Sequence, residues 1–129
     1  MKPNLMVVFV CEHGGAKSVL AAAYFNQFAK GMGTNLRAVA RGTNPDSELS
    51  PQTIKGLSDD GLTPSELVPQ KLTEIEIQSA QRVVTFCELP VEYHGQTIIE
   101  RWDDIPPVSQ NYEQARDTIV ARIHQMLDR

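Results

Sequence analysis

The sequence predicts an α/β fold, in which residues 1–129 form one domain around a four-stranded parallel sheet with helices on both faces. Short apolar runs alternate along the chain with segments of helical periodicity, which is typical of right-handed βαβ units. The run 5–10 is apolar without interruption, as expected for a parallel strand that is buried on both faces. A length of 129 residues, 41% of them hydrophobic, is enough for one domain with a full core.

The first half of the chain begins with the strand 5–10. A helix follows from Ala16 or Lys17 to about Lys30, because apolar side chains recur there at helical spacing, and glycines come after it. Residues 36–40 have the length and composition of a second strand. These three segments form the first predicted βαβ unit.

The second half begins with a short helix, in which Ser50 is the N-cap, Pro51 occupies the first turn, and Ile54 and Leu57 point inward. Residues 62–72 are predicted to be a connection over the surface. The remaining predictions are a helix over 74–80 opened by a capping box of Thr73 and Glu76, strands over 82–87 and 96–100, and a last helix from Ser109 or Gln110 onward.

Residues 11–18 read CEHGGAKS and connect the first strand to the first helix. Gly14 and Gly15 can adopt positive φ and let the amides of the turn point inward, and a helix N-terminus adds a favourable dipole for an anion. The same surroundings favour the thiolate form of Cys11. The alternative is that Cys11 only packs at the end of a strand. We call this segment the anion loop, because its pattern predicts a thiolate beside an oxyanion site.

The anion loop resembles that of the low-molecular-weight protein tyrosine phosphatases and the thioredoxin-coupled arsenate reductases, in which Cys, five residues and Arg are followed by Ser or Thr. Here Cys11 and Ser18 keep the spacing, but Lys17 replaces the arginine and offers a point charge instead of a planar fork. Glu12 would repel a dianion unless it points outward or pairs with Lys17. The resemblance covers essentially the whole chain and implies the strand order 2-1-3-4.

The resemblance assigns roles to residues of the loop. Cys11 is expected to attack the substrate, and Ser18 either donates a hydrogen bond to the thiolate or only begins the helix. Arg41, at the end of the second strand, either supplies the missing guanidinium or is an exposed arginine at a turn. The expected oxyanion-binding residues are Glu12, His13, Gly14, Gly15, Ala16, Lys17 and Ser18, with Arg41 as an addition.

A carboxyl group is expected to protonate the leaving group. In the family this acid is an aspartate before a proline in the loop after the last strand, and Asp103 and Asp104 precede Ile105 and two prolines here. Counting back from the last helix favours Asp103, whereas closeness to the proline favours Asp104. The alternative is an acidic turn on the surface.

Cys87 separates two versions of the function. The arsenate reductases use a second cysteine near this position to attack the first, and a third to pass the disulfide outward, but this chain has only Cys11 and Cys87. If Cys87 is the resolving thiol, thioredoxin, glutathione or mycothiol must complete the cycle. The alternative is a buried packing cysteine at a strand end.

Composition excludes several other classes. A net charge of -4 without a cluster of Lys and Arg argues against nucleic-acid binding, and the N-terminal apolar run is too short for a signal peptide or a membrane span. The spacing of His13 and His94 matches no known metal site, and the resemblance implies no cofactor. We therefore expect a cytoplasmic protein with reduced thiols and no resident metal.

These observations lead to one functional expectation. The chain should be a cysteine-dependent enzyme that acts on small phosphate-like oxyanions or phosphate esters through Cys11, as a phosphatase or as an arsenate reductase. The alternative is that Lys17 and Glu12 have abolished turnover and left an anion-binding or regulatory module of the same fold. The oligomeric state and the natural substrate do not follow from the sequence.

Overall fold

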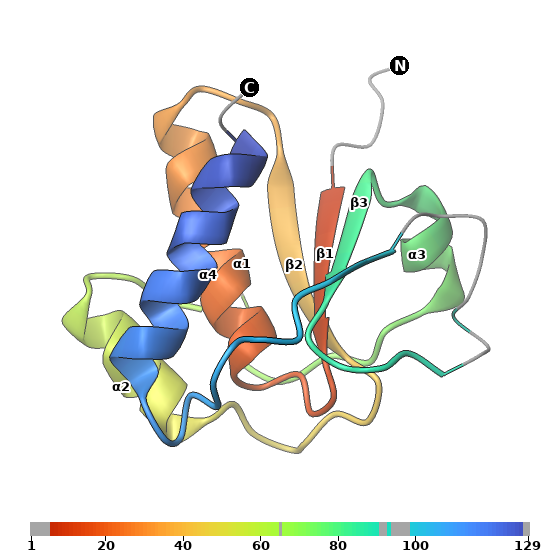
Figure 1. Cartoon of the computed structure of the whole chain (residues 1–129). Coiled ribbons are helices and arrows are strands. Elements are labelled where there is room, and N and C mark those ends of the chain that lie inside the picture. Colours follow the sequence, from red (N-terminus) through yellow and green to blue (C-terminus); the bar gives the residue numbers. More distant parts are fainter. Residues whose placement is uncertain (1–5, 65, 91–92, 94–98, 128–129) are drawn as a thin grey trace.

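The computed structural model describes residues 6–64, 66–90, 93 and 99–127. Its strands form one parallel sheet in the order β2-β1-β3-β4, which confirms the expected order. The strands are β1 (Met6–Cys11), β2 (Arg37–Gly42), β3 (Arg82–Thr85) and β4 (Ile99–Arg101) (Figure 1). Most of the strand predicted over 96–100 cannot be compared, because residues 94–98 lie outside the described residues.

Helices cover both faces of the sheet, as predicted (Figure 1). The helices are α1 (Lys17–Gly31), α2 (Pro51–Asp59), α3 (Glu74–Ser79) and α4 (Tyr112–Leu127). Val7 and Phe9 of β1 belong to the core cluster that includes α1 and α4, whereas Val8 and Val10 belong to the cluster that includes Ile77 of α3. This alternation follows from the two-residue period of a strand that is buried on both faces.

Local signals determine where the short helices begin. The Ser50 hydroxyl accepts a hydrogen bond from the amide of Thr53 at 3.3 Å and caps α2. The predicted capping box at the start of α3 is present. The prediction that Ile54 points inward is wrong: its side chain is 42% exposed, while Thr53 and Leu57 are buried. Those two residues are four apart and share a face, which leaves Ile54 on the solvent side of α2.

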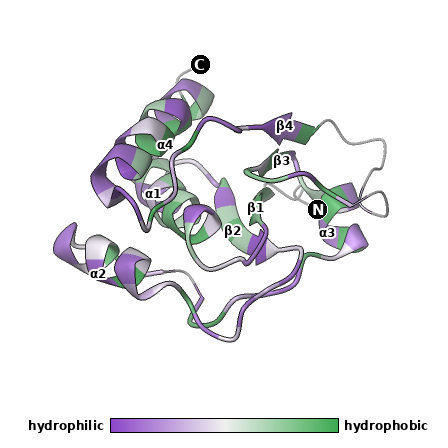
Figure 2. Cartoon of the chain, turned by 60° about the horizontal axis from the view of Figure 1, so that its bottom comes forward, coloured by the Kyte–Doolittle hydropathy of each residue, from purple (hydrophilic) through white to green (hydrophobic). Residues whose placement is uncertain are grey.

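All four strands point the same way, so the segments that follow them meet at one edge of the sheet. This edge lies at the bottom of Figure 1 and comes forward in Figure 2. It carries the anion loop after β1, residues 43–50 after β2, residues 86–90 after β3 and residues 102–111 after β4. Within the described part of the chain, no helix is both long enough and apolar enough to cross a bilayer.

Candidate active site

The segment after β2 holds the anion loop in place through the loop's carbonyl groups. Four amides of residues 43–50 donate to four carbonyl oxygens of the loop, which fixes these oxygens on the outside of the turn. The bonds run from Thr43 to Cys11 at 3.3 Å, from Asn44 to Glu12 at 2.8 Å, from Asp46 to His13 at 3.0 Å and from Ser50 to Gly15 at 2.8 Å.

The amide groups of the anion loop are left for a ligand. Within the described residues, no amide of 12–16 donates a hydrogen bond to the protein, and Ala16, the N-cap of α1, provides no side-chain cap. Gly14 has a φ of 67°, and a Cβ on it would lie 3.0 Å from the amide nitrogen of Gly42. The turn therefore needs a glycine there, and its amides at the start of α1 are donors that could bind an oxyanion.

The two polar side chains at the ends of the anion loop meet. The Sγ atom of Cys11 lies 3.0 Å from the Oγ atom of Ser18, and both residues are buried. Ser18 is also the second residue of α1, so it begins the helix and contacts the sulfur at once. A hydroxyl at this distance can stabilise a thiolate by donating to it.

A pocket of about 610 Å³ opens above Cys11. Two of its walls were not predicted: residues 46–51, which lead into α2, and residues 107–109, which lead to α4. The turn composition of residues 44–46, directly after a predicted strand, is the sequence signal that could have indicated the first of these walls. Besides Cys11, the lining consists of Glu12, His13, Gly15, Ala16, Lys17, Asp46, Ser47, Glu48, Leu49, Ser50, Pro51, Phe86, Cys87, Pro107, Val108 and Ser109.

The charges of the anion loop are arranged to leave its lysine for an anion. The Glu12 side chain is 62% exposed, and its carboxylate lies 3.9 Å from Nε2 of His13. Glu12 also lines the pocket, but within the described residues its carboxylate forms no ion pair with Lys17. Within the described part of the chain, Lys17 forms no ion pair, although it lines the pocket. Its ammonium group is therefore available to a ligand in the pocket.

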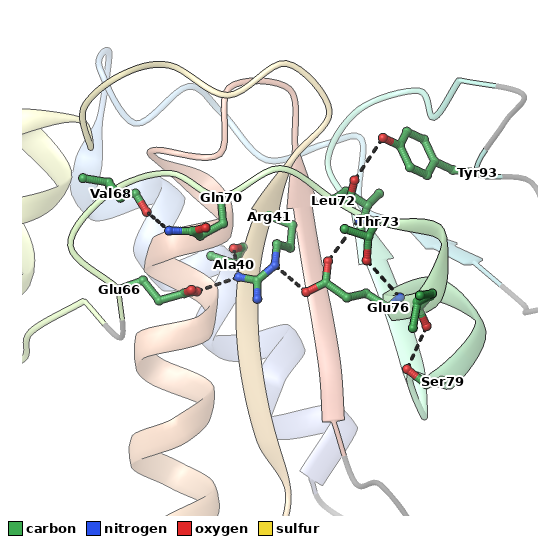
Figure 3. A network of polar contacts seen from close by, with 11 residues as sticks. Ala40, Arg41, Glu66, Val68, Gln70, Leu72, Thr73, Glu76, Ser79 and Tyr93 are labelled. Carbon is green, nitrogen blue, oxygen red and sulfur yellow. Dashed lines mark hydrogen bonds and ion pairs between the residues drawn. The ribbon is translucent and has the colours of Figure 1, made fainter.

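The structure does not bring the Arg41 side chain to the anion loop, although the Arg41 backbone lies against Gly14. Its guanidinium is 13% exposed and donates to Glu66 at 2.6 Å and to Glu76 at 2.7 Å (Figure 3). Side chains alternate along β2, and Arg41 is paired with Val10, on the face that α3 covers. Arg41 therefore joins the connection and α3 to the sheet. It neither supplies the missing guanidinium nor is an exposed arginine at a turn, so both alternatives are corrected.

The structure also leaves the two expected acids outside the pocket lining. The carboxylate of Asp103 accepts from Arg101 at 3.0 Å, and that of Asp104 accepts from Arg122 of α4. Both side chains are more than 60% exposed. The reason lies in the residues around them: Trp102, Ile105 and Val108 are buried at three-residue spacing, so the positions between them face solvent.

Cys87 and Cys11 line the same pocket as free thiols. The amide of Cys87 donates to the hydroxyl of Thr85 at 3.1 Å, which holds the residue just beyond the end of β3. The pKa of the Cys87 thiol is raised, mainly by burial and further by the charges of Cys11 and Glu12. Hydrogen bonds with Thr85 and Thr43 act in the opposite direction and lower it in part. Cys87 therefore shares the pocket with Cys11, and its surroundings favour the thiol form over the thiolate.

The histidines do not gather around a common centre. His13 lies in the pocket, His124 is exposed on α4 with its ring 4.4 Å from that of Phe28, and His94 falls outside the described residues. Among the residues that the structure describes, no three His, Cys, Asp or Glu side chains are grouped in a way that could hold a metal ion.

Several solved structures share this fold. A thioredoxin-dependent arsenate reductase from Corynebacterium glutamicum has a TM-score of 0.77 and 23% identity, over 98% of this chain and 62% of that chain, so the present chain spans less than two thirds of that reductase. An arsenate reductase from Archaeoglobus fulgidus has a TM-score of 0.80 and 23% identity, over 95% and 99% of the two chains. A low molecular weight protein tyrosine phosphatase from Bacillus subtilis has a TM-score of 0.79 and 19% identity, over 95% of each chain.

Identities this low establish the fold alone, but the sequence also matches a family model. The model described as low molecular weight phosphotyrosine protein phosphatase matches residues 6–118, which include the anion loop and both cysteines. The match gives no support to a module without turnover. The chain is therefore an enzyme of the low molecular weight phosphotyrosine protein phosphatase family.

Proposed function

We propose that this enzyme acts on phosphate-like oxyanions or phosphate esters through the thiolate of Cys11. The observation that supports the proposal is the geometry of the anion loop. Its sulfur lies 3.0 Å from the Ser18 hydroxyl, beside amides of residues 12–16 that have no acceptor among the described residues. Preformed donors of this kind stabilise the charge that develops on a substrate oxyanion.

Each polar group of the loop has a role in this proposal. Cys11 attacks the phosphorus or arsenic atom, and the loop amides bind the equatorial oxygens. Lys17 adds a charge in place of the arginine, and Ser18 donates to the sulfur and stabilises the thiolate. Because most contacts come from backbone amides, the exchange of arginine for lysine removes a bidentate side-chain contact but keeps the amide donors of the loop.

A second candidate, reduction of arsenate, is favoured by the position of Cys87 in the same pocket. Cys11 would first replace one oxygen of arsenate and form a sulfur–arsenic bond. The displaced oxygen would leave as water. The Cys87 thiol would then pass its proton to an arsenic-bound oxygen and attack the Cys11 sulfur, the electron pair of the sulfur–arsenic bond would stay on arsenic, and arsenite would leave as the disulfide forms. A thiol reductant such as thioredoxin, glutathione or mycothiol would restore both thiols. The name of the C. glutamicum neighbour supports a thioredoxin-type partner.

Two assays on three proteins test the proposal. We expect the wild type to hydrolyse a chromogenic aryl phosphate, or to form arsenite from arsenate in the presence of a dithiol, and Cys11→Ser to lower either rate by at least about 10³-fold. Cys87→Ser should stop arsenite formation and spare ester hydrolysis, which needs only the first thiol. If the reduced, folded wild type shows neither activity, the proposed function is wrong.

Calorimetric titration of the wild type and two Lys17 variants separates binding from turnover. Phosphate, sulfate or arsenate should bind to the wild type at millimolar concentration, and Lys17→Ala should weaken binding more than Lys17→Arg. Anion binding without either activity would instead support the alternative of a binding or regulatory module.

A further inference from the structure

We propose that Arg41 is a positioning residue for the anion loop, and that it acts through the backbone of Gly42, the next residue along the chain. The inference rests on the proposed function and goes beyond it, because it names a side chain outside the pocket on which oxyanion binding depends. The Arg41 side chain does not line the pocket. It is 13% exposed and binds Glu66 and Glu76, on the face of the sheet that α3 covers (Figure 3).

Gly42 lies directly against the anion loop. A Cβ placed on it would be 2.8 Å from the amide nitrogen of Gly14 and 3.0 Å from the carbonyl carbon of His13, so the two backbones are in contact. The residue after it, Thr43, donates to the carbonyl of Cys11 at 3.3 Å. Because the loop amides are the donors offered to an oxyanion, a displacement of Gly42 moves these donors as well.

Gly42 is held in turn by residues 70–72 of the connection between α2 and α3. Its amide donates to the carbonyl of Gln70 at 2.9 Å, and its own carbonyl accepts from the amide of Leu72 at 2.9 Å. These two bonds form a parallel bridge beside the end of β2. Leu72 is 1% exposed and packs in the core cluster on this face of the sheet. The position of Gly42 therefore depends on where residues 70–72 lie.

The guanidinium of Arg41 fixes the chain on both sides of residues 70–72. Its Nη1 atom donates to the carboxylate of Glu66 at 2.6 Å, before this segment, and its Nε atom donates to that of Glu76 at 2.7 Å, after it. Glu76 belongs to α3 and also completes the capping box of that helix. A planar cation with several donors can bind two carboxylates at once. One side chain thus ties the segment that holds Gly42 to β2 and to α3.

The charges make this arrangement depend on the arginine. The side chains of Glu66 and Glu76 are 31% and 19% exposed, and within the described residues neither forms an ion pair with another cation. Without Arg41, two partly buried carboxylates would be left unpaired, which is unfavourable and would drive the connection outward. A lysine at this position would restore one charge, but it lacks the planar fork that binds both partners.

Phosphate binding by the folded protein separates positioning from stability. In Arg41→Ala we expect calorimetric titration to give a several-fold higher Kd for phosphate, and kcat for an aryl phosphate to fall roughly 10- to 10²-fold, because the donors of the loop are displaced. Arg41→Lys should recover part of both losses.

Arg82→Ala is the matched control. It removes another arginine–glutamate pair of the sheet, in which Arg82 lies 2.5 Å from Glu100. Arg82 is the first residue of β3, at the end of the strand away from the anion loop. This variant should lower thermal stability and leave the Kd for phosphate unchanged.

A double-mutant cycle tests the route through the connection. Glu66→Ala removes the same contact without touching β2, so it should also raise the Kd. The double variant Arg41→Ala/Glu66→Ala should bind phosphate no more weakly than Arg41→Ala alone, because the two residues act through one contact. Should Arg41→Ala fail to fold, Glu66→Ala and Arg41→Lys give the same test.

Three results would overturn the inference and leave the proposed function intact. Wild-type Kd and kcat in folded Arg41→Ala and Glu66→Ala would mean that the ion pairs only stabilise the fold. An equal rise of the Kd in Arg82→Ala would mean that phosphate affinity follows general stability. Additive effects of the Arg41 and Glu66 substitutions would mean that they do not act through their contact. A wild type that binds no phosphate and shows neither activity would contradict the proposed function and this inference together.

Discussion

The anion loop and the segment after β4, residues 102–109, lie at the same edge of the sheet but are held by different forces. We call the second segment the aspartate loop. Main-chain hydrogen bonds from residues 43–50 hold the anion loop, whereas the aspartate loop is anchored by the buried side chains of Trp102, Ile105 and Val108. The first presents backbone amides to a ligand. The second presents its aspartates to solvent and to arginines.

The difference predicts that the two loops tolerate change differently. A site made of backbone donors keeps its shape when a side chain changes, so Lys17 can stand where the family has an arginine. A site that depends on the position of one carboxylate changes when the residues next to that aspartate are substituted. In the aspartate loop the buried three-residue pattern determines which side chains face inward, and neither aspartate belongs to that pattern.

The largest expected effect tests the apolar anchoring of the aspartate loop. Ile105 is 4% exposed, so Ile105→Ala should lower the free energy of unfolding by about 2–5 kcal/mol. Asp103→Asn and Asp104→Asn, matched controls in the same loop, should each change it by less than about 1 kcal/mol, because exposed ion pairs contribute little. Urea unfolding measures all three, and an aspartate variant as damaging as Ile105→Ala would contradict the comparison.

The next effect tests the main-chain contact behind the anion loop. A Cβ on Gly42 would lie 2.8 Å from the amide nitrogen of Gly14, so Gly42→Ala should lower the free energy of unfolding by roughly 1–3 kcal/mol and weaken phosphate binding. Gly31 at the end of α1 has no atom within 4 Å of such a Cβ, and Gly31→Ala should instead stabilise the protein by roughly 0.5–1 kcal/mol. Urea unfolding and calorimetric titration with phosphate measure both effects. Equal stability and equal phosphate binding of Gly42→Ala and Gly31→Ala would contradict the close contact between Gly42 and Gly14.

The smallest effect concerns Cys87, which lies at the same edge as both loops. Burial raises the pKa of its thiol above the ordinary range, and a charge on Cys11 raises it further. Alkylation of Cys87 should therefore begin at a higher pH than that of an exposed thiol, and Cys11→Ser should move its onset to lower pH, because one charge that opposes ionisation is gone. Mass spectrometry of alkylated protein across pH gives both curves, and an onset unmoved by Cys11→Ser would contradict the coupling of the two thiols.

Much of the architecture could be predicted from the sequence, because it depends on residues that are close along the chain. The uninterrupted apolar run of β1, the glycines of the anion loop and the capping box of Thr73 and Glu76 each determine local structure by themselves. The meeting of Cys11 and Ser18 follows from the same local turn, since the five residues between β1 and α1 bring them together. The strand order was available through the family resemblance, and the structure confirms it.

Only the tertiary structure decided which charged side chains reach the pocket. Arg41 stands at a plausible position in the sequence, but its partner Glu76 comes from another part of the chain and holds its side chain away. The position of the His13 side chain also depends on a distant residue, because Asp46 lies beside it only when the segment after β2 packs against the anion loop. A backbone turn is determined by its own residues, whereas a long charged side chain follows the strongest partner that the fold brings within reach.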